Sequence, residues 1–318
     1  MRAHWKPILA LLLITPFLTE LLSGSLSASE FFRPHVILFL STVGYGFPIL
    51  LLREFAVRRQ LGIAGLFVLG IVYGFFNEGI LAKTFYLATN VPINKFDGYG
   101  YVGGIAVPWA IMISTWHALH SLLYPILASY YFFPNHRETP WLKGREMVWL
   151  AVPTVALGTL IFFHPGQDRE AGHFGHFVLM IAAGGLLVWL STRLPRAPTL
   201  NGEGVLRRRT MLWGGLAFLT LVFVPVLMAG AKIPALAFGG YYALLVGFML
   251  RMLRRQTSLP MTTALLFALG DDSLLALLGV VLAVPEGNIE KLITNAAFVG
   301  VFVWLIARLR RSAKVTVS

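Results

Sequence analysis

Ten apolar stretches recur along the chain, separated by shorter segments in which charged, Gly and Pro residues gather. Each stretch reaches the practical minimum of about 17 residues for a helix that crosses a hydrocarbon core about 30 Å thick. The pattern therefore predicts an all-α fold, a polytopic membrane helix bundle with about ten transmembrane helices. We place these helices at 7–23, 36–52, 61–81, 105–133, 147–163, 174–194, 211–229, 234–250, 261–284 and 289–305.

The Lys and Arg residues alternate between the segments that join these helices. Twenty of the 26 fall in segments on the same side as the N-terminus, and six fall on the opposite side. Because positive residues gather in cytoplasmic loops, this bias predicts that both termini are cytoplasmic. One helix more or fewer would reverse the side of every later segment, so the charge pattern also supports the count of ten.

Composition excludes an ordinary soluble globule, because 57% of the residues are hydrophobic, only 13% are charged and the mean hydropathy is +0.74. The formal net charge of +12 would suggest a nucleic-acid partner in a soluble protein. Here cytoplasmic loops beside anionic lipid explain it. The expected partner is therefore the lipid bilayer, with no nucleic acid. Cysteine is absent, which excludes disulfides and thiolate chemistry.

The whole chain, 1–318, is interpreted as a single transmembrane domain, because no polar block is large enough to fold alone. Segment 195–210 is rich in Pro, Gly and Arg, which is typical of a linker. We predict that it lies in the cytoplasm and joins a six-helix half, 1–194, to a four-helix half, 211–318.

The first apolar stretch allows a second interpretation. Arg2 and Lys6 precede it and small residues follow at 27–29, as in a cleavable signal peptide. Glu20 favours a retained helix, because a cleaved segment has no use for a carboxylate.

Seven polar side chains fall inside the predicted helices, where an ionisable group costs at least a few kcal/mol and is by default a sign of function. A rise of 1.5 Å per residue and the predicted topology place most of them in the outer half of the bilayer. We therefore expect one shared polar cavity open to the outside. The seven are Glu20, Asn77, Glu78, His117, His120, Asp271 and Asp272.

His117 and His120 lie three residues apart and so share one face of an α-helix. Two such imidazoles can ligate one metal, and Glu78 could complete the set or act as general base on a bound water. We expect these three as catalytic residues and as ligands of one divalent metal such as zinc. In the alternative interpretation, the imidazoles only form hydrogen bonds that pack the helices together.

Asp271 and Asp272 are harder to explain as packing, because adjacent carboxylates repel each other. The functional interpretation is a proton or cation relay, to which Glu20 and Asn77 could contribute. The alternative is a helix broken at Gly270, whose polar turn lines a water-filled cavity. Arg53 and Glu54, at the cytoplasmic end of the second predicted helix, are interpreted as an interfacial ion pair of little energetic value.

A set of short motifs resembles a group of uncharacterised prokaryotic multi-pass membrane proteins. The resemblance covers roughly the first 145 residues and implies a prokaryotic inner membrane location, without an activity. The motifs are 19–25, Tyr45-Gly46, Arg53-Glu54, Tyr73-Gly74, Glu78-Gly79, His117 and Pro140-Trp141-Leu142.

More remotely, the third and fourth predicted helices resemble the CAAX-protease and bacteriocin-processing intramembrane proteases. That family carries a Glu-Glu pair followed by Arg and then Phe-x-x-x-His. Here Asn77-Glu78 stands at the Glu pair, Ala82 replaces the Arg, and Trp116 to His120 replaces the Phe motif. The resemblance implies catalytic roles for Glu78 and His120.

Three functions are compatible with these residues. The first is a membrane-embedded hydrolase, metal-dependent or Glu/His-based, that acts on a lipid or a membrane peptide. The second is a transporter or proton-coupled carrier that uses Glu78, Asp271 and Asp272. The third is a non-catalytic assembly or lipid-binding protein.

Overall fold

The computed structural model describes residues 4–164, 173–196, 199–200, 208–254 and 258–315. Within these ranges nine helices are long and apolar enough to cross a membrane. They correspond to the second to tenth predicted helices. The first is also present, as one continuous helix over 5–21, and its length of about 26 Å falls just short of a hydrocarbon core about 30 Å thick. The polytopic all-α fold is therefore confirmed.

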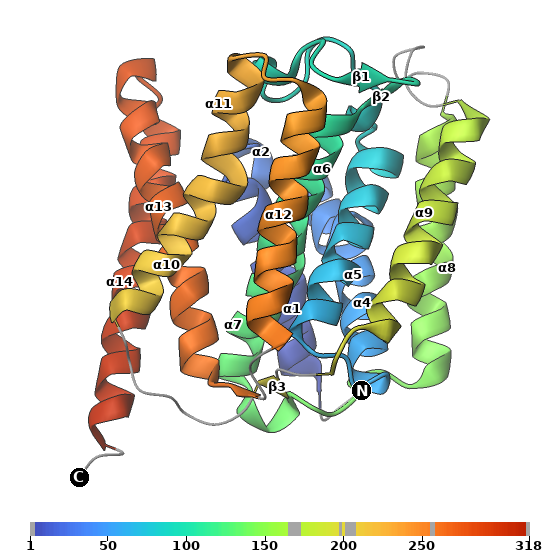
Figure 1. Cartoon of the computed structure of the whole chain (residues 1–318). Helices are drawn as coiled ribbons and strands as arrows, with labels where there is room; N and C mark the ends of the chain where they lie inside the picture. Colours follow the sequence, from blue (N-terminus) through green and yellow to red (C-terminus); the bar gives the residue numbers. More distant parts are fainter. Residues whose placement is uncertain (1–3, 165–172, 197–198, 201–207, 255–257, 316–318) are drawn as a thin grey trace.

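The helices run antiparallel to their neighbours in the sequence and form one bundle (Figure 1). Short 3-10 turns η4 Thr84–Tyr86, η5 Asn94–Phe96 and η7 Pro134–His136 lie in two of the connections. Two small strand pairs complete the fold: β1 Tyr101–Val102 is antiparallel to β2 Ile105–Ala106, and β3 Thr199–Leu200 is parallel to β4 Ser258–Leu259. The helices are α1 Trp5–Pro16, η1 Phe17–Leu21, α2 Ala28–Phe31, α3 Pro34–Phe39, η2 Leu40–Gly44, α4 Gly46–Arg58, α5 Ile63–Phe76, η3 Asn77–Leu81, α6 Val107–Trp116, η6 His117–Leu123, α7 Tyr124–Phe132, α8 Gly144–Phe163, α9 Phe174–Arg193, α10 Arg208–Phe218, η8 Leu219–Phe223, α11 Val224–Gly230, α12 Ala235–Arg254, α13 Met261–Glu286 and α14 Ile289–Val315.

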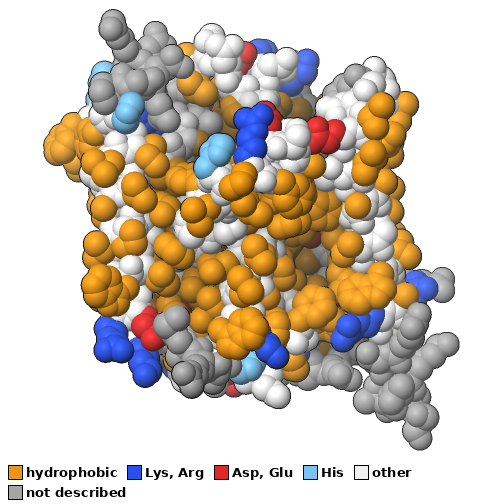
Figure 2. Space-filling model, turned by 180° about the vertical axis from the view of Figure 1, so that it is seen from behind, with side chains coloured by type: hydrophobic (Ala, Val, Ile, Leu, Met, Phe, Trp, Pro, Cys, Tyr) orange, Lys and Arg blue, Asp and Glu red, His pale blue; other side chains and the backbone are white. Residues whose placement is uncertain are grey.

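Two spans form the centre of the bundle. The span Val107–Phe132, built from α6, η6 and α7, is 83% buried, and Ile63–Leu81, built from α5 and η3, is 72% buried. The peripheral helices α8, α9 and α12 are 11–17% buried and expose apolar side chains. Figure 2 shows such an apolar band between charged ends on one face of the molecule. This distribution is that of a bundle solvated by lipid, so polar groups on the central spans are shielded from lipid.

Contacts between loops follow the predicted alternation. At one end, His4 contacts His136 at 2.9 Å, and Arg196 contacts Gln60 at 3.2 Å. At the other end, Ser29 contacts Glu290, and His176 contacts Gly103. α1 begins and α14 ends at the same end of the bundle (Figure 1). That this end is cytoplasmic stays a prediction. Much of the predicted linker 195–210 lies outside the described residues.

Five π-helical segments interrupt the described helices, namely η1, η2, η3, η6 and η8. A π turn pairs residue i with i+5 and frequently marks a functional site. Prolines explain two carbonyls that accept side-chain hydrogen bonds, since Pro48 and Pro225 follow η2 and η8 closely and have no N–H to donate. For example, the Leu221 carbonyl, four residues before Pro225, accepts the Tyr242 hydroxyl at 2.6 Å.

α13 is continuous through Gly270, so the predicted alternative of a helix broken at that residue is wrong. Gly270 serves helix packing instead. A Cβ there would lie 2.1 Å from the Met211 carbonyl oxygen, and one at Gly214 would lie 2.0 Å from the Phe267 carbonyl oxygen. Small residues allow the two backbones to approach this closely. The contact with α10 fixes the position of Asp271 and Asp272.

Candidate functional site

A His–Glu pair joins the two central spans. Nε2 of His117, in η6, lies 2.9 Å from Oε1 of Glu78, in η3, and both residues are buried. Thr84 donates its hydroxyl to the other carboxylate oxygen of Glu78, and the Trp109 indole N–H donates to Thr84 at 2.9 Å. Nδ1 of His117 contacts the Ser121 hydroxyl at 2.7 Å. Every polar atom of the pair is thus engaged, which fixes both side chains.

Two tyrosines surround this pair. Tyr45 donates its hydroxyl to Glu20, and its ring lies 6.3 Å from that of His117. The Tyr73 ring packs edge-on against His117, with 5.4 Å between centroids, and the Tyr73 hydroxyl accepts the Asn77 amide at 2.8 Å. Glu20 and Asn77 therefore reach the neighbourhood of His117 through tyrosines.

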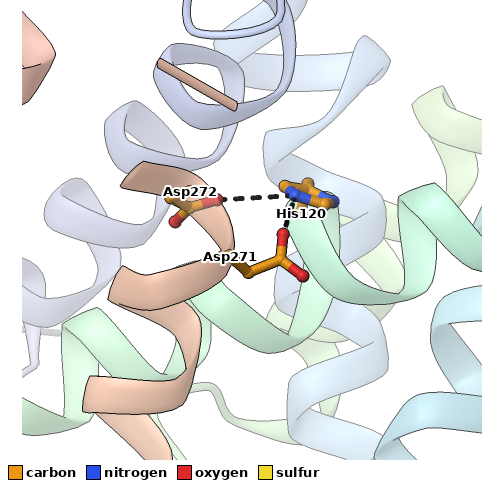
Figure 3. A group of neighbouring side chains, drawn as sticks. All are labelled: His120, Asp271 and Asp272. Atoms are coloured by element: carbon orange, nitrogen blue, oxygen red, sulfur yellow. Dashed lines mark hydrogen bonds and ion pairs between the residues drawn. The ribbon is translucent and has the colours of Figure 1, made fainter. Parts of the chain in front are cut away.

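A second cluster lies one turn further along η6 (Figure 3). Nε2 of His120 lies 2.8 Å from Oδ1 of Asp271 and 3.5 Å from Oδ1 of Asp272, both on α13. All three residues are at most 3% exposed. Thr19 packs against η6 between the two clusters, since its hydroxyl lies 3.1 Å from the Ser121 hydroxyl and 3.4 Å from the backbone carbonyl of His120.

The seven side chains singled out from the sequence thus gather in one polar interior. The spacing predicted that His117, His120 and Glu78 surround one metal, and the structure separates them. His117 contacts Glu78. His120 contacts Asp271 and Asp272 instead. In the π-helical geometry of η6 each turn holds more residues than in an α-helix. Positions three apart therefore diverge, and the two imidazoles meet different helices.

Sequence reasoning gave no site role to the residues that connect the seven, namely Tyr45, Tyr73, Thr84 and Ser121, although Tyr45 and Tyr73 stand in the motifs of the family resemblance. Their hydroxyls are inconspicuous in an apolar helix, and no spacing rule relates them to the acids. Tyrosines buried in the middle of a span were the available signal, since a buried hydroxyl needs a partner.

The prediction of a weak interfacial pair for Arg53 and Glu54 is wrong. α4 extends to Arg58, and both side chains are fully buried and 2.5 Å apart. The guanidinium stacks 3.7 Å from the centroid of Trp141 and donates to the His136, Arg137 and Thr139 carbonyls. Glu54 accepts the backbone N–H groups of Trp141 and Leu142. The pair anchors the connection between α7 and α8 to α4.

The fold and the buried polar interior define a polytopic, all-α integral membrane protein with ionisable groups at its centre. Over residues 9–316 the chain matches the profile of a family described as an uncharacterized membrane protein family, and it belongs to that family. The suspected membership in an uncharacterised multi-pass family is thereby confirmed, whereas the comparisons show no resemblance to the intramembrane proteases. No curated protein and no solved structure matches the chain.

Proposed function

We propose that the protein is a membrane-embedded hydrolase in which Glu78, oriented by His117, acts as general base on a water. The observation that carries this proposal is the 2.9 Å contact between His117 and Glu78 in a buried site. A general base must be held within hydrogen-bond reach of the group that it serves, and orienting partners fix it there.

The surroundings of the pair suit this role. The hydrogen-bond network assigns the tautomer of His117. The Ser121 hydroxyl donates to Nδ1, so the ring proton lies on Nε2 and is donated to the Glu78 carboxylate. That hydrogen bond holds the Glu78 carboxylate in one orientation, as a general base requires. The Glu78 side chain is 11% exposed and the His117 side chain 3%. Glu78 is therefore the more accessible partner.

The location of the pair supports a substrate class. Residues of two spans hold it within the apolar part of the bundle, so a substrate arrives from the bilayer, as a lipid or a membrane peptide does. Water attacks an acyl or peptide carbonyl, its proton passes to Glu78, and the same proton is then delivered to the leaving oxygen or nitrogen. The reaction needs no further reagent.

The test uses the full chain in proteoliposomes that contain a fluorogenic phospholipid ester or a labelled transmembrane peptide. Glu78→Gln preserves size but removes the base, and we expect it to lower the cleavage rate by about 10²–10⁴-fold. His117→Gln is expected to lower it less. The matched control is His35→Gln, since His35 is exposed. Full cleavage by folded Glu78→Gln overturns the proposal.

The second candidate is a proton-coupled carrier. It is favoured by the two buried His–carboxylate pairs whose histidines lie three residues apart on η6, because neighbouring ionisable groups in a membrane are typical of proton relays. An imposed pH gradient on proteoliposomes with an enclosed pH-sensitive dye tests it. Proton uptake that His117→Gln and Asp271→Asn both abolish favours the carrier, and dye signals equal to those of empty liposomes exclude it.

A further inference from the structure

One cluster remains outside the proposed hydrolytic pair. His120, Asp271 and Asp272 each present one donor atom, and these atoms all lie within 4.8 Å of one another. We propose that these three residues bind a single divalent transition-metal ion, Zn²⁺ or Mn²⁺. An imidazole nitrogen with two carboxylate oxygens suits such ions, and three protein ligands leave a coordination position for water. The site is distinct from the grouping of His117, His120 and Glu78 that the sequence suggested.

Unsatisfied oxygens are the first argument. Oδ2 of Asp271 and Oδ1 of Asp272 are buried and accept no hydrogen bond of standard geometry among the described residues, although Oδ1 of Asp272 lies 3.5 Å from Nε2 of His120 and the Tyr124 hydroxyl interacts with Asp271. Asp271 is fully buried and Asp272 is 3% exposed. Buried carboxylates are normally paired, hydrogen-bonded or bound to a metal. These oxygens point to the third possibility, because a shared cation gives each of them a partner.

The orientation of the imidazole is the second argument. Nδ1 of His120 donates to the Trp116 carbonyl at 3.2 Å, which leaves Nε2 directed at the carboxylates. The ring stacks on Trp116, with centroids 3.8 Å apart at 14°, and meets Tyr124 edge-on at 5.1 Å. A ligating histidine almost always donates its other ring N–H to a carbonyl or carboxylate in this way. The donor nitrogen is therefore held in place before any ion arrives.

Charge is the third argument. The two adjacent carboxylates carry a formal charge of −2, and an imidazolium at His120 compensates only half of it. No Lys or Arg among the described residues forms an ion pair with either acid. A dication with a neutral imidazole brings the net charge of the cluster to zero, which an apolar interior strongly favours. The alternative way to reach zero net charge is to bind two protons, one on His120 and one on a carboxylate.

The ion would join η6 to α13, residues that are 151 positions apart in the chain. α13 is held rigidly at this point by its contact with α10 at Gly214 and Gly270. The bound metal would therefore stabilise the packing of α13, which comes from the predicted four-helix half, against the central span.

The experiment measures the metal content of the full chain, purified in detergent without chelator and then dialysed against Zn²⁺ or Mn²⁺. We expect about one ion per chain in the natural protein and at least a tenfold loss in His120→Ala, Asp271→Asn and Asp272→Asn. The matched controls His117→Ala and Glu78→Gln alter the other His–carboxylate pair and should retain the ion. This readout is independent of hydrolysis, so the hydrolase proposal can fail while the metal site stands.

Should the Asp variants fail to fold, the natural protein alone gives the answer. Its melting temperature should fall on treatment with a zinc chelator and recover with Zn²⁺. The proposal is overturned if the dialysed natural protein holds no ion, which favours the two-proton alternative. It is also overturned if folded Asp271→Asn and Asp272→Asn keep the ion, or if Glu78→Gln loses it.

Discussion

The Tyr73 hydroxyl donates a hydrogen bond to the Gly44 carbonyl over 2.7 Å. In an uninterrupted α-helix this carbonyl would accept the N–H of the residue four positions on, which is Pro48 and has none. The Ile49 N–H bonds to Tyr45 instead. A tyrosine of the central span thus satisfies a carbonyl that a proline left free, and it holds its ring against His117 as a result.

Tyr73→Phe should destabilise the protein by about 1–3 kcal/mol, because it leaves the buried Gly44 carbonyl and the Asn77 amide without a partner. Unfolding in detergent, monitored by circular dichroism, measures the effect. Pro48→Ala restores an N–H that can reach Gly44. The double variant should therefore lose less than the two single variants together, and strict additivity would contradict this account.

Arg53→Met should cost about 3–5 kcal/mol, because it removes the buried partner of the Glu54 carboxylate and leaves only the exposed Arg58, 3.8 Å away. The anchored connection between α7 and α8 should also become open to limited proteolysis within 134–143. Arg59→Met, at an exposed position of the same helix end, serves as control. Equal stability and equal cleavage in the two variants would show that the buried pair does not anchor this segment.

Gly214→Ala should destabilise the protein by about 1–3 kcal/mol, because the added methyl group overlaps the backbone of α13. Gly239→Ala, on α12, is a matched control in which nothing lies within 4 Å of the new Cβ. It should be neutral or stabilising by about 0.5–1 kcal/mol, as expected for Gly→Ala inside a helix. Chemical unfolding of both variants decides, and a harmless Gly214→Ala would contradict the close helix contact.

Lys83 gives a pH-dependent prediction outside the spanning helices. Burial lowers the pKa of Lys83 from its ordinary value of 10.5, so the folded protein binds this proton less well than the unfolded chain. The lowered pKa therefore reduces the free energy of unfolding. This loss of stability is complete below the folded-state pKa of Lys83 and disappears as the pH rises to 10.5. Lys83→Met should thus raise the melting temperature at pH 7 and raise it less at pH 10.5. The exposed Lys95→Met should show no such difference.

The fold was largely predictable from the sequence, since apolar runs and the alternation of Lys and Arg depend only on the chain's position relative to the bilayer. Of the nine spans, seven begin and end within three residues of their predicted bounds, whereas the last ends at Arg310 instead of 305 and the second continues to Arg58. That extension moved Arg53 and Glu54 from the interface into the interior. The hydropathy pattern predicted that the helix ends before Arg53, because both residues are charged. Their mutual ion pair allows them to be buried, so the helix continues past them.

The polar interior was predictable in membership but not in pairing. An ionisable side chain is conspicuous in an apolar run, so the sequence identifies Glu78, His117 and Asp271. Which of them meet depends on the rotation of each helix about its axis. π-helical turns at η3 and η6 change that rotation, and hydrophobic periodicity does not record them.

Those π turns also have an evolutionary consequence. A π segment accommodates one residue more than the α-helical turn it replaces, so a single inserted codon can create it without breaking the helix. Because the wider turn absorbs the extra residue, the later side chains of that helix keep their orientation, and only the residues within the π turn are displaced. Three such segments, η1, η3 and η6, carry Glu20, Glu78 and the two histidines. An ancestral apolar bundle could therefore have acquired a reactive interior in a few small genetic steps, with its loops and lipid-facing surface unchanged.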